Sequence, residues 1–150
     1  MKLPPEIRER FRRHGRAGGR TRASRMIPAA RTAVARRAAT ARWIRQRFGS
    51  SSFVELGLPG AELVDAGLLE LADGKVTLGS LLVSLAAPRL RREGVPLGTV
   101  HEDPEERLYA LLARSAGELA HARYGAYLRQ LSSFADACRT ARLEREPRAS

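Results

Sequence analysis

The sequence predicts an all-α fold: a small helical bundle with a basic, partly extended helical arm at its N-terminus. Aliphatic residues between Phe53 and Leu131 recur at helical spacing, whereas residues 1–50 are rich in arginine, alanine and glycine. Charge divides in the same way. Residues 1–50 hold 15 Lys/Arg against two Glu, a net +13, and residues 51–150 hold 12 Lys/Arg against 14 Asp/Glu, a net −2. We therefore expect a basic arm over residues 1–50 and a helical body over residues 51–150.

Length and composition exclude several classes of protein. A chain of 150 residues is one domain, or a small domain with an appended arm. Cys138 is the single cysteine, so no disulfide can form within the chain. Apolar runs are too short for a membrane span, and the basic N-terminus lacks an apolar signal core. We expect a cytoplasmic protein with no membrane partner.

The arm is predicted to begin with a helix that glycines interrupt. Pro5 favours a helix start, because a first-turn residue needs no amide donor. Three glycines in five residues can adopt positive φ and are expected to break this helix: Gly15, Gly18 and Gly19. One more short helical turn is expected over residues 20–25.

A longer helix is predicted from Pro28 to Arg47, with Gly49 as its stop. Its apolar stripe is narrow and mostly alanine: Ala30, Val34, Ala38, Ala41 and Phe48. Burying an alanine methyl removes little area from water, so we expect the arm to order fully only against the body, a partner chain or nucleic acid. Trp43 and Phe48 are expected to be core anchors rather than platforms for stacked bases.

Arginines without neighbouring carboxylates predict that the arm binds the phosphates of DNA or RNA. The 14 guanidiniums of residues 1–50 repel one another, and a polyanion relieves that repulsion and releases counter-ions. A merely solvated surface would alternate arginine with glutamate, which this arm does not. The candidate nucleic-acid-binding residues are Arg12, Arg13, Arg16, Arg20, Arg22, Arg25, Arg31, Arg36, Arg37, Arg42, Arg45 and Arg47.

The body is predicted to hold four helices, over residues 59–72, 78–87, 104–116 and 118–143. Pro88 kinks or ends the second, and Asp103 is the expected N-cap of the third. Residues 71–78 leave two interpretations open. Asp73-Gly74 lies within alternating residues that are typical of a hairpin, which would make a wing. Alternatively Gly74 ends one helix and Thr77 begins the next, which we favour because the leucines continue at helical spacing.

The last helix carries a heptad seam, defined by Ala120, Tyr124, Tyr127, Leu131, Phe134 and Cys138. Such a seam packs along another helix. We expect it to bind a partner protein, or a second copy of the chain in a homodimer. The candidate partner-binding residues are Tyr124, Tyr127, Leu131 and Phe134.

Candidate catalytic and metal-ligating residues are few. His101 lies beside a run of carboxylates that ends at Glu106, but a helix start explains acidic residues there without a metal ion. His121 is expected to be a hydrogen-bonded, partly buried histidine, and Cys138 a small core residue. We expect no enzymatic activity, no metal and no cofactor.

The arm resembles a basic segment of small bacterial proteins carried on plasmids and prophages. That segment has Gly-x-x-Gly-Gly-Lys/Arg-x-Arg-Ala, then Pro-x-x-Arg, then Ala-Arg-Lys/Arg-Ala-Ala-x-Ala-Arg-Trp. The matching positions are Gly15, Gly18, Gly19, Arg20, Arg22, Ala23, Pro28, Arg31, Ala35, Arg36, Arg37, Ala38, Ala39, Ala41, Arg42 and Trp43. The chain departs from it at Ala30, where Glu is common.

The body resembles helical proteins of bacterial toxin–antitoxin and phage-defence operons. The matching positions are Leu81, Leu82, Val83, Ser84, Ala87, Pro88, Arg89, Leu90, His121, Arg123, Tyr124, Ser133 and Phe134. The two resemblances imply an antitoxin-like regulator whose body binds a cognate toxin. Its arm would contact nucleic acid or cover an RNA-reading surface of the toxin. The alternatives are a structural protein that binds DNA or RNA without sequence preference, and a winged-helix transcription factor if residues 71–78 form a hairpin.

Overall fold

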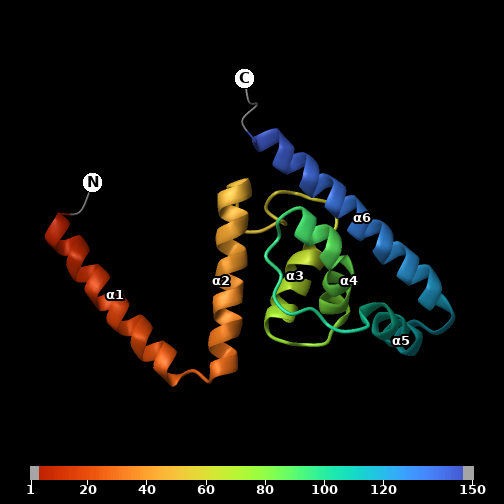
Figure 1. Ribbon diagram of the computed structural model, residues 1–150, viewed down its shortest axis with the longest axis horizontal. Coiled ribbons are helices and arrows are strands. Elements are labelled where there is room, and N and C mark those ends of the chain that lie inside the picture. The colour runs from red at the N-terminus through yellow and green to blue at the C-terminus, as the bar shows by residue number, and fades with distance from the viewer. Residues whose placement is uncertain (1–3, 147–150) are drawn as a thin grey trace. The chain divides into compact units, whose positions relative to one another are not determined.

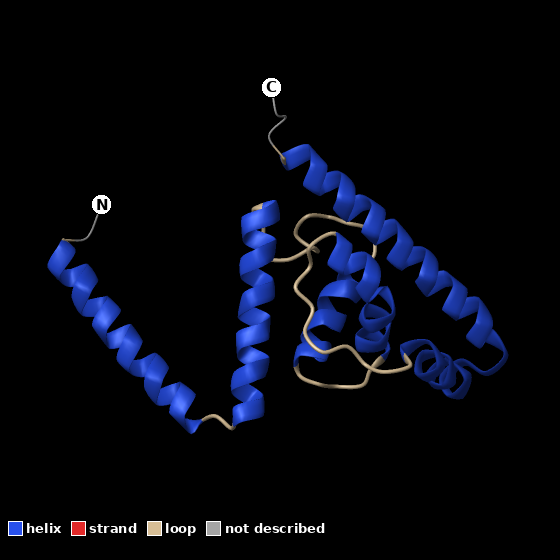
Figure 2. Ribbon diagram, in the orientation of Figure 1, coloured by secondary structure: helices blue, strands red, loops and turns tan. Residues whose placement is uncertain are grey.

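The computed structural model describes residues 4–146, which form helices and connecting loops with no strand among them (Figure 2). The all-α prediction is therefore confirmed. The elements are α1 (Pro5–Arg25), α2 (Pro28–Phe48), α3 (Ala61–Ala72), α4 (Leu78–Arg92), α5 (Pro104–Ala116), the 3-10 helix η1 (Gly117–Leu119) and α6 (Ala120–Arg145); Figure 1 labels the six α-helices.

The chain divides into two compact units, Met1–Thr32 and Ala33–Ser150. This division lies inside α2, whereas the sequence predicts a boundary after residue 50. The difference arises because the second half of α2 supplies core residues to the body. None of the described helices is apolar over a stretch long enough to cross a bilayer.

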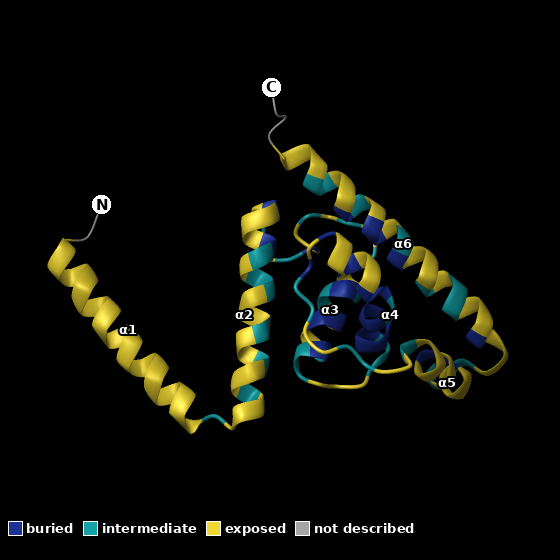
Figure 3. Cartoon of the chain, in the orientation of Figure 1, coloured by how far each residue is buried: buried dark blue, intermediate teal, exposed yellow. Residues whose placement is uncertain are grey.

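The first unit is dominated by α1, which has no buried residue (Figure 3). The predicted glycine break is wrong: Gly15, Gly18 and Gly19 lie within one continuous helix, and none has a positive φ. Each glycine costs a helix about 1 kcal/mol relative to alanine, but this penalty is finite. Arginine and alanine, which fill most of the remaining positions, are among the strongest helix formers.

In the second unit α2 is anchored by its last turns. Ile44 and Phe48 are 2% and 1% exposed, and the Phe48 ring packs edge-on against Phe53 at 5.8 Å. Phe53 meets Phe134 of α6 at 5.0 Å, so aromatic rings connect α2 to α6. The prediction of Trp43 and Phe48 as core anchors is confirmed, since Trp43 also packs on this cluster.

The predicted apolar stripe of α2 needs correction. Ala41 and Phe48 face the body, but Val34 and Ala38 are exposed. The buried side runs through Ile44 instead. Alanines on several sides of a helix do not identify which side is buried, because each methyl removes little area from water.

Helices α3 and α4 cross closely and are joined by a turn. Gly67 of α3 and Gly79 of α4 lie against each other: a Cβ atom added to Gly67 would sit 2.4 Å from the Gly79 carbonyl oxygen. In the turn Gly74 has φ 71°, which favours glycine. Thr77 caps α4 by accepting a hydrogen bond from the Ser80 amide at 3.1 Å.

The two-helix interpretation of residues 71–78 is thus confirmed. No residue from 69 to 78 forms a strand, so the wing required by a winged-helix factor is not present there.

The remaining helices follow the predicted order with two local differences. Pro88 lies inside α4, which continues to Arg92. Asp103 holds the N-cap position of α5, but its backbone is left-handed at φ 46° and its side chain makes no capping hydrogen bond. Gly117, at φ 55°, ends α5 as predicted.

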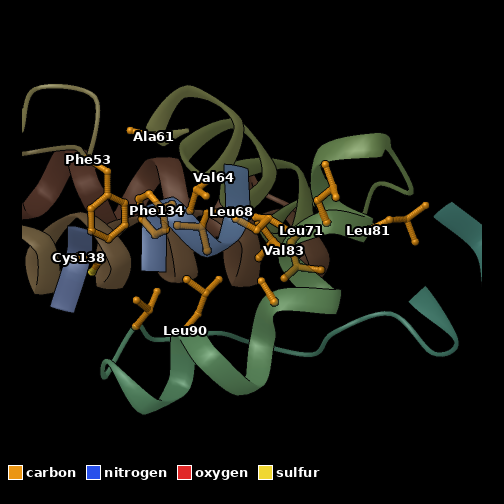
Figure 4. Packing of buried hydrophobic residues seen from close by; sticks show 14 of the residues in the cluster. Phe53, Ala61, Val64, Leu68, Leu71, Leu81, Val83, Leu90, Phe134 and Cys138 are labelled. Atoms are coloured by element: carbon orange, nitrogen blue, oxygen red, sulfur yellow. The ribbon is translucent and has the colours of Figure 1, made fainter. Parts of the chain in front are cut away.

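The seam of α6 is part of the core of its own chain. Phe134 and Cys138 are fully buried and Leu131 is 6% exposed (Figure 4 shows Phe134 and Cys138 among the core side chains). Tyr127 packs against the same core, and the Tyr124 hydroxyl donates a hydrogen bond of 2.7 Å to Glu105.

The prediction that Tyr124, Tyr127, Leu131 and Phe134 bind a partner is therefore corrected for Leu131 and Phe134, which are buried, whereas Tyr124 and Tyr127 are partly exposed. A heptad seam specifies packing along a second surface but not whose surface it is, and here helices of the same chain supply it.

Candidate nucleic-acid interface

Arginines of α1 form a continuous line on one face of the helix. Four of them are spaced four residues apart: Arg8, Arg12, Arg16 and Arg20. At 1.5 Å rise and 100° per residue, neighbours in this line are separated by about 6 Å along the axis, and the line covers a face about 120° wide. Arg13 lies about 20° beyond Arg20, at the edge of this face. All of these residues are exposed.

Carboxylates are nearly absent from this part of the chain. No Asp or Glu occurs between Glu9 and Glu55. Within α1 the Arg12 guanidinium lies 3.8 Å from Glu9, and both side chains are more than half exposed. An ion pair so open to water contributes little, so it does not neutralise the helix. The positive charge of α1 is therefore available to an external polyanion.

The twelve predicted arginines are divided between the two units. Arg12, Arg13, Arg16, Arg20, Arg22, Arg25 and Arg31 belong to the first unit. The other five belong to the second unit, and three of these contact the body. Arg37 forms an ion pair with Asp73, Arg36 lies against Gly98, and Arg47 lies 3.9 Å from Glu146. Arg42 and Arg45 are exposed on α2.

The predicted set leaves out Arg8 and Arg10 of the same helix. Arg8 begins the four-residue spacing, which is visible in the sequence, whereas Arg10 lies outside the line. The predicted glycine break concealed this spacing, because it divided one line of arginines between two short segments.

Two exposed apolar side chains lie in the first half of α1, opposite the arginine line. Ile7 is 41% exposed and Phe11 is 67% exposed. Gly18 lies on the same side, and a Cβ atom added there would meet nothing within 4 Å. Near the end of the helix Arg22 and Arg25 occupy this side, so the apolar surface is confined to the first turns of α1.

The histidines and the cysteine have structural surroundings. The His101 ring nitrogen Nε2 lies 3.1 Å from both the Ser80 hydroxyl and the Lys75 carbonyl, and its backbone amide donates to Ser84. Ser80 is 0% exposed and its hydroxyl belongs to the α4 capping box, so this serine cannot meet a substrate. The contacts instead hold the loop before α5 against α4.

His121 is exposed, so the prediction of a partly buried histidine is wrong. Burial raises the pKa of the Cys138 thiol to about 11, which keeps it protonated and unreactive at neutral pH. Among residues 4–146, no group of three His, Cys, Asp or Glu side chains is arranged to hold a metal ion.

No protein family, no curated protein and no solved structure matches this chain.

Proposed function

We propose that the chain binds the phosphate backbone of nucleic acid without sequence preference, through the arginine face of α1. The observation that carries this proposal is the line of exposed arginines on α1, which holds eight arginines against Glu6 and Glu9 and is followed by no carboxylate before Glu55. Guanidiniums bind phosphates with two parallel hydrogen bonds, and each contact releases condensed counter-ions.

The composition of α1 favours contacts to phosphates over contacts to bases. The helix contains no Asn or Gln, the residues that pair with the edge of adenine, and besides arginine its polar side chains are Glu6, Glu9, His14, Thr21 and Ser24. A helix about 10–12 Å wide fits the major groove of B-form DNA, and its arginines would lie along the phosphates of the groove walls.

Salt dependence provides the first test. Four arginines that each neutralise one phosphate give a slope of log K against log salt of about −4 on duplex DNA. Fluorescence anisotropy with the full chain and labelled duplexes of unrelated sequence measures this slope. A large affinity difference between unrelated duplexes of equal length would contradict the proposal.

A matched pair of variants locates the surface. In the first, Arg12, Arg16 and Arg20 are replaced by Gln; in the second, Arg107, Arg114 and Arg123 on α5 and α6 are replaced by Gln. Both lose three exposed charges. The first should reduce the salt slope by about 3, and the second should leave it nearly unchanged. Equal losses of affinity would show that α1 is not the contact surface.

An antitoxin-like role is a second candidate, favoured by one observation. Ile7 and Phe11 are exposed on α1 opposite the arginines, which provides an apolar surface for a partner protein. The seam of α6 no longer supports this role, because it is buried in the core. If the product of the adjacent gene is toxic and this chain relieves the toxicity, Phe11→Ser should abolish relief while retaining nucleic-acid affinity. Relief that survives Phe11→Ser argues against this surface.

A further inference from the structure

A second concentration of arginines lies in the body, between α4 and α6. It surrounds a pocket of about 580 Å³. Its walls carry four guanidiniums, two from each helix: Arg89, Arg92, Arg139 and Arg142. None of these residues belongs to α1 or to the predicted nucleic-acid-binding set. On sequence alone Arg89 and Arg92 are explained as cations near a helix C-terminus, where they favour the helix dipole.

Two of the four guanidiniums are held in place by polar groups of the pocket itself. Arg142 donates from Nε to Glu93 at 3.1 Å, and Glu93 is only 8% exposed. Arg89 donates from Nη1 to the Ser132 hydroxyl at 3.1 Å. A carboxylate is costly to bury unless it is paired. Arg142 also donates from Nη1 to Glu146 at 2.8 Å, so the two carboxylates fix its guanidinium beside the pocket and Nη2 is the nitrogen that neither of them engages.

The other two guanidiniums have no counter-ion among the described residues. Neither Arg92 nor Arg139 forms an ion pair with any residue from 4 to 146. The lining carboxylates are Glu93 and Asp136, and Glu146 accepts a hydrogen bond from Arg142, so four guanidiniums face three carboxylates, a formal charge of +1. A phosphate monoester carries about −1.5 to −2 at pH 7 and is attracted by this excess.

A second pocket with a largely aliphatic lining adjoins the arginines. It has a volume of about 540 Å³, shares Arg89, Arg92 and Ser132 with the first pocket, and adds Arg129 and the apolar residues Leu85, Ala86, Pro88, Leu128 and Leu131. A ligand that occupies both would place an anionic group among the guanidiniums and an uncharged part against these aliphatic side chains.

We propose that the groove between α4 and α6 binds a small molecule in which a phosphate monoester is joined to an apolar group. Planar guanidiniums match phosphate oxygens in pairs, which a lysine ammonium does not. The adjoining apolar pocket selects the attached group. This site is independent of α1 and does not require the nucleic-acid proposal.

Calorimetric titration of the full chain tests the site with two probes, inorganic phosphate and phenyl phosphate. Phenyl phosphate should bind more tightly than inorganic phosphate, and Leu128→Ser should reduce that difference. The double variant Arg92→Gln, Arg139→Gln should lose at least tenfold in affinity for both. A control with the same charge loss, Arg107→Gln, Arg114→Gln on α5, should bind like the wild type. Circular dichroism checks that each variant remains helical.

Several results would overturn the proposal. One is equal binding by the double variant and its control, which would mean adventitious charge attraction. Another is absence of binding at millimolar concentrations of both probes.

A DNA duplex without terminal phosphates distinguishes the two possible sources of the phosphate, a small phosphate monoester and the backbone of nucleic acid. If the duplex displaces phenyl phosphate and binds the Arg92→Gln, Arg139→Gln variant less tightly than the wild type, the groove belongs to a nucleic-acid surface instead. The α1 variant of Arg12, Arg16 and Arg20 should leave phenyl phosphate binding unchanged, so failure of either proposal is visible separately.

Discussion

Replacing Gly67 by alanine should destabilise the body, although alanine is the better helix former. The added methyl carbon would lie 2.4 Å from the Gly79 carbonyl oxygen and 2.6 Å from Cγ2 of Val83. A backbone oxygen cannot move unless α4 moves with it. Overpacking a core costs about 1–3 kcal/mol, and this contact belongs at the upper end. Subtracting the gain of about 1 kcal/mol in helix propensity leaves a net loss of about 2 kcal/mol.

A loss of that size is easily measured. It should lower the melting temperature by roughly 8 °C for a body of this length, and urea unfolding followed by circular dichroism gives the free energy directly. Gly125 of α6 is the matched control. A Cβ atom there would meet only the flexible Arg129 side chain, at 3.4 Å, so Gly125→Ala should stabilise by up to about 1 kcal/mol. If both variants stabilise the protein equally, the close crossing of α3 and α4 is wrong.

Three further predictions concern a cap, a thiol and the arm. Thr77→Ala removes the capping box with Ser80 and should cost about 1 kcal/mol in urea unfolding, whereas the exposed Thr140→Ala should cost much less. The pKa of the Cys138 thiol is raised to about 11, so the unfolded chain ionises first as pH rises. The free energy of unfolding should therefore decline between about pH 9 and 11 by on the order of 2–3 kcal/mol. Cys138→Ala should remove this decline, and parallel pH profiles of the two proteins would contradict the prediction. Because α1 buries none of its residues, deleting residues 1–25 should leave the melting temperature of the body within error, and a fall of several degrees would refute this.

The sequence predicts those parts of the fold that depend on neighbours along the chain. Thr77 as a helix start, Gly74 as a helix end and the leucine spacing of α4 are local features, and the structure confirms them. The glycine break in the arm failed for a quantitative reason. A penalty of about 1 kcal/mol per glycine weakens a helix but does not specify where it ends.

Features that depend on distant parts of the chain were predicted poorly. Gly67 suggests a weak helix on sequence alone, but its small size is what allows α3 and α4 to approach. The seam through Leu131 and Phe134 was identified correctly as a packing surface and assigned to the wrong partner.

The arginine pocket could not be predicted at all. Arg92 and Arg139 are 47 positions apart, and only the packing of α4 beside α6 brings them together. The burial of Glu93 among arginines indicates this pocket in the structure. The sequence does not show that Glu93 is buried.

The complete exposure of α1 has a consequence for the lifetime of the arm. Proteases of trypsin type cleave after arginine where a segment can unwind into their active site, and α1 offers eight such bonds with no packing to protect them. A polyanion along the helix would cover the same side chains that the protease must recognise. The fraction of α1 helices bound to a polyanion would then determine how long the arm remains uncleaved. The body, which has its own core, would survive the protease longer than the arm.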